Sequence, residues 1–345
     1  MNSLERVSLI LQHKEADHVP VYPLINSISR KYTGIDYATW CQDTDLCAES
    51  IIKATEDLDV DVICSLVDLS VEAADFGQPI EYPKDAAARP VHNDRIIKSI
   101  KDYAKVEPIN PRKTPRMSEH IRLCDILVKA KGKEKPVVAF VFGPLGVLSM
   151  MRGQQDMFMD LFDDPDSMHM ALEAITQTLE EYCKALMETG VHAIMFDTLY
   201  ASQSIMSKEM WDVMEGPYVE RLANLVHDNG RMVMIHNCGT GIYFDVQIKR
   251  MRPQAISFLH IPDDCSSFAE AKEKYGHQTT LIGRIPPSFI MSATPEEIEE
   301  ECKKDIDTFK KNGGFILATG CEYPANASIE NARVMVRTAK TYGRY

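Results

Sequence analysis

Apolar residues along the chain gather into eight short runs, and most of these runs are separated by segments of helical character. A short run that is apolar throughout predicts a strand buried on both faces, as in a parallel sheet covered by helices. The predicted strands are residues 19–23, 61–68, 137–144, 192–198, 231–237, 254–260, 279–285 and 314–320.

Several of the intervening segments show helix signals. Residues 163–190 begin with acidic residues, place apolar residues three and four positions apart and end at Gly190, as expected for an amphipathic helix. Thr294 and Pro295 suit the N-cap and the first position of a further helix. Residues 327–345 predict the last helix of the chain.

Eight strands that alternate with helices over 345 residues predict a (β/α)8 TIM barrel with an N-terminal helical extension. We expect a single domain over residues 1–345, with the polar, proline-dotted segment 81–120 as an excursion from it. An open doubly wound sheet is the alternative fold. It is weakened because the chain has no Gly-x-Gly-x-x-Gly turn after its first strand and no Gly-x-x-x-x-Gly-Lys loop.

Composition narrows the class of protein. A net charge of −13 argues against a nucleic-acid partner, because binding to phosphates relies on clustered Lys and Arg. No apolar stretch approaches the ~18 residues of a membrane span. Glu5 and Arg6 interrupt the N-terminus where a secretory signal needs an unbroken apolar stretch. We therefore expect a cytoplasmic protein without membrane contact, whose nine cysteines stay reduced.

Candidate chemistry is found at the predicted strand ends. In a barrel of this kind, the residues that directly follow the strands share the C-terminal mouth, where active sites form. The polar or reactive residues at these positions are Asp68, Asp197, His236, Cys238, His260, Arg284, Cys321 and Glu322.

Three of these strand-end residues, His236, Cys238 and Cys321, are of types that bind zinc. Three protein ligands with a fourth position left open are typical of catalytic zinc, whereas structural zinc is closed by four protein ligands. The wide separation of Cys238 from Cys321 also differs from the close cysteine pairs of structural sites. Spacing alone leaves a second interpretation open, in which the three residues are polar loop residues that cap strand ends.

Five longer segments connect the chain to a known family. They are ERVSLILQHKEADHVPVYP, VDLSVEAADFGQPIEYP, FGPLGVL, IMFDTLYASQSIMSKEMWDVMEGPY and LATGCEYPANASIENARVMV. In these segments the chain resembles the uroporphyrinogen decarboxylase superfamily over nearly its whole length. That family has a (β/α)8 barrel, which agrees with the strand count.

The resemblance favours one branch of that superfamily. The decarboxylase branch has a Met-Arg-Gln-Ala-Gly-Arg motif that holds the substrate's carboxylates, but here Asn26 replaces the first arginine and only Arg30 remains. The loss weakens the decarboxylase interpretation, because a guanidinium fork suits carboxylates. The other branch, the methylcobamide:coenzyme M methyltransferases, binds zinc through His-x-Cys and a distant Cys. His236, Cys238 and Cys321 match that pattern.

The resemblance therefore implies a zinc-dependent methyltransferase. A methyl group would move from a methylcorrinoid, carried by a partner protein, to a small-molecule acceptor. A coenzyme-M-like thiol is the favoured acceptor, since zinc promotes thiol deprotonation and the thiolate is the nucleophile. Tetrahydrofolate is the second candidate acceptor, and uroporphyrinogen decarboxylation is the alternative activity.

The remaining candidates receive roles within this interpretation. We predict that Asp68, Asp197 and Glu322 are catalytic, with Asp68 at the position of the decarboxylase branch's catalytic aspartate. The residues predicted to contact the substrate are Asn26, Tyr200, His260 and Arg284. Arg284 stands where the family usually has asparagine, and two roles are open for it. It could clamp a sulfonate, carboxylate or phosphate, or it could form a buried ion pair with a mouth carboxylate.

Overall fold

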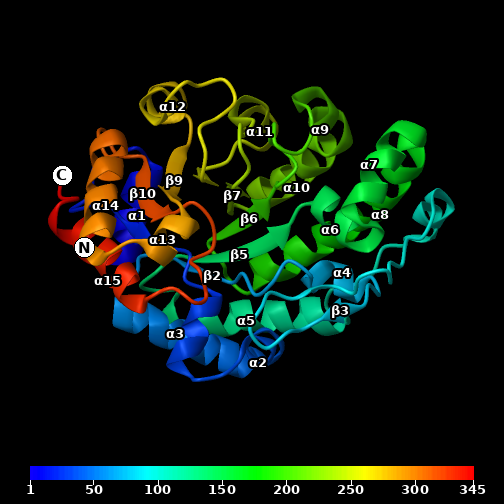
Figure 1. Ribbon diagram of the computed structural model, residues 1–345, viewed down its shortest axis with the longest axis horizontal. Helices are drawn as coiled ribbons and strands as arrows, with labels where there is room; N and C mark the ends of the chain where they lie inside the picture. The colour runs from blue at the N-terminus through cyan, green and yellow to red at the C-terminus, as the bar shows by residue number, and fades with distance from the viewer.

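The eight predicted strands all form in the computed structural model, which describes residues 1–345, and they pair in parallel. They are β1 (Val21–Tyr22), β2 (Ile63–Cys64), β5 (Val137–Phe142), β6 (Ala193–Asp197), β7 (Met232–Asn237), β8 (Ala255–Phe258), β9 (Thr280–Ile285) and β10 (Phe315–Thr319). Their order in the sheet is β1-β10-β9-β8-β7-β6-β5-β2. The strands follow the chain around a central barrel with helices outside it (Figure 1), which confirms the predicted (β/α)8 fold.

The barrel closes between its two shortest strands, β1 and β2. Both are shorter than the apolar runs predicted, and no strand ladder joins them. Asp61 bridges this seam instead, because its N–H donates to the Val21 carbonyl at 2.9 Å and its Oδ2 accepts from the Val21 N–H at 2.8 Å. Arg6 donates to the other oxygen of Asp61 at 2.7 Å. A buried ion pair therefore stabilises the closure.

Alternation along the strands divides the core in two. Val138 and Phe140 of β5 belong to a cluster of 15 buried residues inside the barrel. Val137 and Ala139 belong to a cluster of 79 buried residues that fills the space between barrel and helices. Successive side chains of a strand point to opposite faces, so both faces must be apolar. This explains the continuous apolar runs of the sequence.

The expected N-terminal helical extension is α1 (Ser3–Leu11). Val7 and Ile10 of this helix belong to the cluster inside the barrel, and the Ile10 carbonyl accepts from the Thr280 hydroxyl at the start of β9. The helix therefore packs across the N-terminal end of the barrel, which leaves the C-terminal end for the site.

The predicted helices form with the expected caps. Residues 163–190 contain α8 (Pro165–Glu188), and Thr294 and Glu297 form a reciprocal capping box at the start of α14 (Pro295–Phe309). The other helices are η1 (Ser27–Tyr32), α2 (Tyr37–Gln42), α3 (Thr44–Leu58), α4 (Val71–Asp75), α5 (Pro115–Lys131), α6 (Pro144–Arg152), α7 (Gln154–Asp163), α9 (Lys208–Met214), α10 (Gly216–Asp228), α11 (Phe244–Met251), α12 (Phe268–Tyr275), α13 (Pro287–Ser292) and α15 (Ile329–Thr341). None of these helices combines the length and the apolar character needed to cross a membrane.

The polar segment 81–120 interrupts the alternation of barrel strands and helices, as predicted. It contains part of a small antiparallel hairpin of β3 (Ile80–Glu81) and β4 (Arg89–Pro90), the 3-10 helix η2 (Ile100–Lys105) and the start of α5. Its backbone is tied to α8, where the Thr178 hydroxyl accepts from the Ile109 N–H. The hairpin loop brings Ala87 and Ala88 to the barrel mouth, so the excursion forms part of the site's wall.

Candidate functional site

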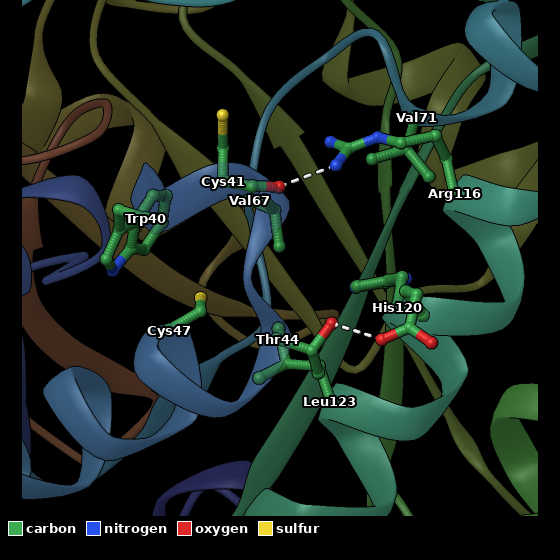
Figure 2. A pocket seen from close by; sticks show the side chains of 10 residues that line it. Trp40, Cys41, Thr44, Cys47, Val67, Val71, Arg116, His120 and Leu123 are labelled. Carbon is green, nitrogen blue, oxygen red and sulfur yellow. Dashed lines mark hydrogen bonds between the residues drawn. The ribbon is translucent and has the colours of Figure 1, made fainter. Parts of the chain in front are cut away.

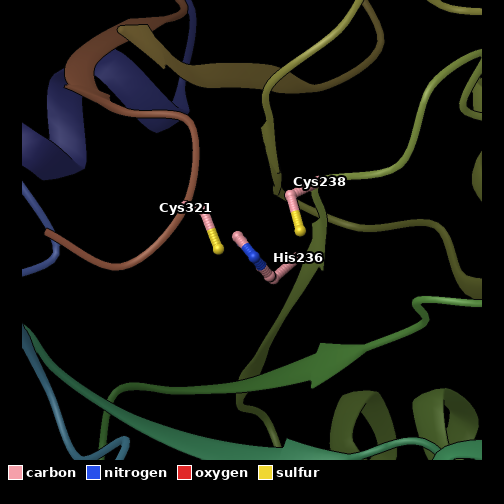
Figure 3. A group of neighbouring side chains, drawn as sticks. All are labelled: His236, Cys238 and Cys321. Carbon is pink, nitrogen blue, oxygen red and sulfur yellow. The ribbon is translucent and has the colours of Figure 1, made fainter. Parts of the chain in front are cut away.

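His236, Cys238 and Cys321 converge at the C-terminal end of the barrel. One ligand atom from each residue lies within 4.8 Å of the other two. Figure 3 shows the imidazole at the end of β7 with the two thiols directed toward it, one from the loop after β7 and one from the loop after β10. One imidazole and two thiols form a donor set that suits zinc or another ion with affinity for sulfur.

The strand ladder positions His236. In the register of the sheet it stands between Asp197 of β6 and Ser257 of β8. Its Nδ1 lies 3.0 Å from the Ser257 hydroxyl, which leaves Nε2 as the ring nitrogen available to a metal. A hydrogen bond of this kind to the second ring nitrogen fixes the orientation of a ligating histidine.

The loop after β7 holds Cys238 through its neighbours. Asn237 is fully buried, and its amide donates to the carbonyls of Thr198 and Ala201 in the loop after β6. A Cβ at Gly239 would lie 2.3 Å from the hydroxyl oxygen of Ser202, so this position requires glycine. The two loops are therefore locked together, and Cys238 has a fixed approach to His236.

Cys321 is held in a comparable way after β10. The Thr319 hydroxyl lies 2.9 Å from the Pro23 carbonyl and 2.7 Å from the Cys321 carbonyl, and it can donate to either of them. A Cβ at Gly320 would lie 2.7 Å from the Cα of Leu259, so only glycine fits between these two loops. Close backbone packing on both sides therefore sets the place of the third ligand.

Hydrogen bonding within the cluster separates the pKa values of its thiols. The bond between Cys238 and Cys321 lowers the pKa of Cys238 and, together with burial, raises that of Cys321. Burial opposes a charge on His236, but its interactions with Cys321, Asp197 and Glu322 together outweigh burial and raise its pKa. The cluster therefore favours a thiolate on Cys238, and a thiolate is the form that binds metals.

The three residues line a cavity of about 240 Å³ at the barrel mouth. Apolar side chains form most of its wall, and β8 and β9 contribute none of the lining residues. The lining residues that carry polar or ionisable groups are Tyr37, Cys64, Asp68, Asp197, His236, Cys238, Cys321 and Glu322, and no Lys or Arg is among them.

Asp197 is the carboxylate beside His236. Burial raises its pKa to about 6, against the opposing effects of His236 and of the Leu199 N–H. Its Oδ1 is buried without any hydrogen-bond partner. An unpaired buried carboxylate oxygen costs free energy, and Asp197 is one of the residues that line the cavity.

Asp68 is the carboxylate in the loop after β2, which only β5 separates from β6 in the sheet, and it is paired. Its Oδ2 accepts from Arg116 of α5, and its Oδ1 accepts from the Ser70 N–H at 2.7 Å. Figure 2 shows Arg116 beside a second, very small cavity, where it also donates to the Cys41 carbonyl at 2.6 Å. Burial still raises the pKa of Asp68 despite Arg116.

Glu322 directly follows the third ligand and is anchored from η1. Its Oε1 accepts from the backbone N–H of Ser27 at 2.9 Å and from the Ser27 hydroxyl at 2.6 Å. Burial raises its pKa, and the Ser27 bonds oppose that rise. These bonds connect the loop after β10 to η1, across the β1–β10 side of the mouth.

The family model for uroporphyrinogen decarboxylase (URO-D) matches residues 2–342. The chain belongs to the uroporphyrinogen decarboxylase family.

Relatives from both branches of the family have similar sequence identities to this chain. The methylcobamide:CoM methyltransferase MtbA of Methanosarcina mazei is 24% identical over 276 residues, covering 80% of this chain and 78% of that protein. A uroporphyrinogen decarboxylase of Actinobacillus succinogenes is 23% identical over 323 residues, covering 90% and 86%. Among solved structures, a methyltransferase from Methanosarcina mazei shares the fold with a TM-score of 0.84 at 18% identity, covering 99% of both chains.

The four residues that we predicted to contact the substrate are not among the residues that line the cavity of this protein. Asn26 and Tyr200 are buried and His260 is exposed, and none of the three lines the cavity. Arg284 forms the predicted ion pair, but its partners are Glu301 and Asp305 of α14, at 2.7 and 3.0 Å, rather than mouth carboxylates. Its guanidinium also packs over Phe268, and Arg284 is not among the residues that line the cavity.

Sequence reasoning missed the residues that hold the site's side chains. Ser257, Arg116 and Ser27 bond to His236, Asp68 and Glu322 respectively. No local signal indicated these partners, because each lies on a different element from the residue it holds. Met150, in the methionine-rich segment 148–162, contributes to the apolar wall of the cavity.

Proposed function

We propose that the protein is a zinc-dependent methyltransferase that transfers a methyl group from a methylcorrinoid on a partner protein to a thiol. The observation that carries this proposal is the convergence of His236, Cys238 and Cys321 within 4.8 Å at the cavity. The similarity to methylcobamide:CoM methyltransferases supports it, because that activity is named for the relatives.

The residues present fit zinc by the chemistry of their donors. Two thiols and an imidazole with a fixed orientation are three protein ligands, and no fourth protein ligand joins the group. This is the ligand number of catalytic zinc. Bound zinc would supply a Lewis acid that keeps an incoming thiol deprotonated near neutral pH.

The chain's own residues then bind and orient the acceptor. The apolar wall excludes water from around the reacting sulfur, which strengthens the electrostatic interactions inside the cavity. The acceptor sulfur would form a bond to the methyl carbon of the donor, and the electron pair of the broken carbon–cobalt bond would remain with the corrinoid of the partner protein. The thiol proton leaves to solvent. Asp197 lines the cavity, where its carboxyl group can accept a hydrogen bond from the acceptor, and its Oδ1 has no partner within the protein.

Tetrahydrofolate is the second candidate acceptor, and Asp197 is the observation that favours it. A pterin ring presents N–H groups, which can donate hydrogen bonds to a carboxylate that has an unpartnered oxygen. The cavity of about 240 Å³ is smaller than the about 300–1,000 Å³ of pockets that bury drug-sized ligands. A thiol is therefore the better fit.

Uroporphyrinogen decarboxylation is the least supported activity. Its substrate carries eight carboxylates, and such groups are usually bound by arginine forks. No Lys or Arg lines this cavity, and Arg116 is already paired with Asp68. Turnover of uroporphyrinogen by the purified protein would overturn this ranking.

Zinc content and methyl transfer test the proposal together. We expect about one zinc per chain in protein purified without added metal, and transfer from methylcobalamin to a thiol. Cys238→Ser removes a ligand and should abolish both. Cys265→Ser is the matched control, because Cys265 is also partly exposed but stands outside the ligand group. A metal-free protein that methylates tetrahydrofolate would contradict the thiol mechanism.

A further inference from the structure

The cavity wall contains three carboxyl groups but no Lys or Arg. Asp68, Asp197 and Glu322 line it together with the ligand group. The arginines that neighbour lining residues in the sequence form ion pairs: Arg89, next to Ala88, pairs with Glu81, and Arg152, close to Met150, pairs with Asp160. Two further arginines were candidates for the mouth. Arg116 bonds to Asp68 and to the Cys41 carbonyl, and Arg30 is buried in η1 outside the lining set.

A metal at this site would not supply the missing positive charge. Two cysteine thiolates already offset the two charges of a zinc ion, so the centre becomes anionic once a substrate thiolate joins it. A further anion in the same cavity would then lack any counter-charge. Burying an unpaired anion costs several kcal/mol, whether the neighbouring carboxyl groups are ionised or protonated.

The tail of a two-carbon thiol cannot avoid this environment. With C–C bonds of ~1.5 Å, a group two carbons from the sulfur stays within about 5 Å of it. In a cavity of about 240 Å³, such a tail lies among the apolar wall and the carboxyl groups. Asp197 lines the cavity and has an oxygen without a partner within the protein, so its carboxyl group can accept a hydrogen bond from a donor on the tail.

We infer that the methyl acceptor is a small thiol with an uncharged or cationic tail that carries a hydrogen-bond donor, and not an anionic thiol such as 2-mercaptoethanesulfonate. This inference rests on the proposed function and names the substrate class of the same site. It separates this chain from the coenzyme M specificity named for its relatives.

A series of thiols that differ only in the tail tests the inference by binding. The zinc-reconstituted protein is titrated at pH 7 with 2-mercaptoethanol, cysteamine and 2-mercaptoethanesulfonate by isothermal calorimetry, with correction for each thiol's own pKa. We expect the first two to bind at least about 10-fold more tightly than the sulfonate. Equal or tighter binding of the sulfonate overturns the inference while leaving a thiol-binding function intact.

Two variants test whether the residues of the cavity wall cause the preference among the thiol tails. Asp197→Asn should weaken the binding of cysteamine relative to that of 2-mercaptoethanol. Asp125→Asn, which changes a partly exposed carboxylate on α5 that pairs with Lys129, should not. Met150→Arg places a cation on a half-buried part of the wall and should shift the preference toward the sulfonate. An unchanged preference in both variants contradicts the inference.

Two further results separate the remaining explanations. If Arg30→Gln weakens sulfonate binding about 10-fold or more, an anion site exists at the mouth and the inference is wrong. If no thiol gives binding heat and none is methylated from methylcobalamin, the proposed function itself fails. If the protein binds thiols and binds the sulfonate as tightly as the others, the proposed function stands and this inference is wrong.

Discussion

At the scale of single residues, one hydrogen bond determines which ring nitrogen of His236 can bind a metal. Its Nδ1 is 3.0 Å from the Ser257 hydroxyl, and both residues are buried. Without that contact the ring can rotate, and either nitrogen can face the thiols. Ser257 therefore sets the ligating nitrogen without being a ligand itself.

We predict that Ser257→Ala lowers the zinc affinity about 10–100-fold, the usual cost of removing a partner of a metal ligand. The fold should remain, because a small buried side chain loses only its hydroxyl. Competition with a chromophoric chelator measures the affinity. Ser292→Ala, at the exposed end of α13, should leave it unchanged. An unaltered affinity in Ser257→Ala would falsify the orienting role.

At the scale of elements, the end of β10 places the third ligand by close packing. Gly320 leaves no room for a side chain against the backbone of Leu259. The loops after β8 and β10 touch at this point, so β8 shapes the site although it does not line the cavity.

Gly320→Ala should therefore displace Cys321 and destabilise the fold by about 1–3 kcal/mol, as overpacking does. We expect a reduced zinc content together with a lower midpoint of chemical unfolding. Gly230→Ala provides the comparison, because its Cβ meets no atom within 4 Å but its φ of +68° is strained. That variant should lose stability and keep its zinc, and zinc loss in both would point to a general effect.

The junction of α4 with β5 should give the protein a pH dependence. Glu72 of α4 is buried and accepts from the Phe142 N–H at the end of β5, and burial raises its pKa from 4.5 to about 8. The folded protein therefore binds more protons than the unfolded chain between these values. The contribution of Glu72 is fully present below pH 4.5 and is lost as the pH rises through about 8.

Glu72→Gln imitates the protonated side chain and should therefore make the free energy of unfolding depend less on pH in this range. The free energy of unfolding of the wild type is expected to fall more steeply than that of the variant between pH 5 and 8. Denaturant titrations at several pH values measure both. Glu300→Gln, on the exposed face of α14, should follow the wild type. Parallel curves for wild type and Glu72→Gln would show that Glu72 does not titrate in this range.

At the scale of the whole molecule, the barrel depends on a closure that is not a strand ladder. Asp61 connects β1 to the segment before β2 and accepts from Arg6 of α1. The same pair thus joins the seam to the helix that packs across the N-terminal end. Asp17 also accepts from Arg6, at 2.7 Å.

Asp61→Ala should reduce the free energy of unfolding by about 1–3 kcal/mol, because it leaves the buried Val21 N–H and one N–H of Arg6 without their acceptor, while Asp17 still pairs with Arg6. Asp57→Ala breaks the surface pair with Arg333 and should cost at most about 1 kcal/mol. Denaturation curves of the two variants give the comparison. A loss of similar size in both would contradict a special role for the seam.

The sequence by itself determined the strands, the main helices and the fold. Their signals are local: Val137–Phe142 is continuously apolar because both of its faces are buried, and Thr294 and Pro295 start a helix wherever it packs. It also indicated His236, Cys238 and Cys321 as a group, because barrel topology brings all strand ends to one mouth.

Only the tertiary structure decided which strand-end residues share the cavity and which do not. Arg284 follows the same strand-end rule as Asp197, yet α14 supplies carboxylates that hold it elsewhere. Asp197 keeps a free oxygen because no neighbouring element brings it a donor. Partners from distant segments set the orientation and the charge of each side chain, and no pattern within a single segment contains that information.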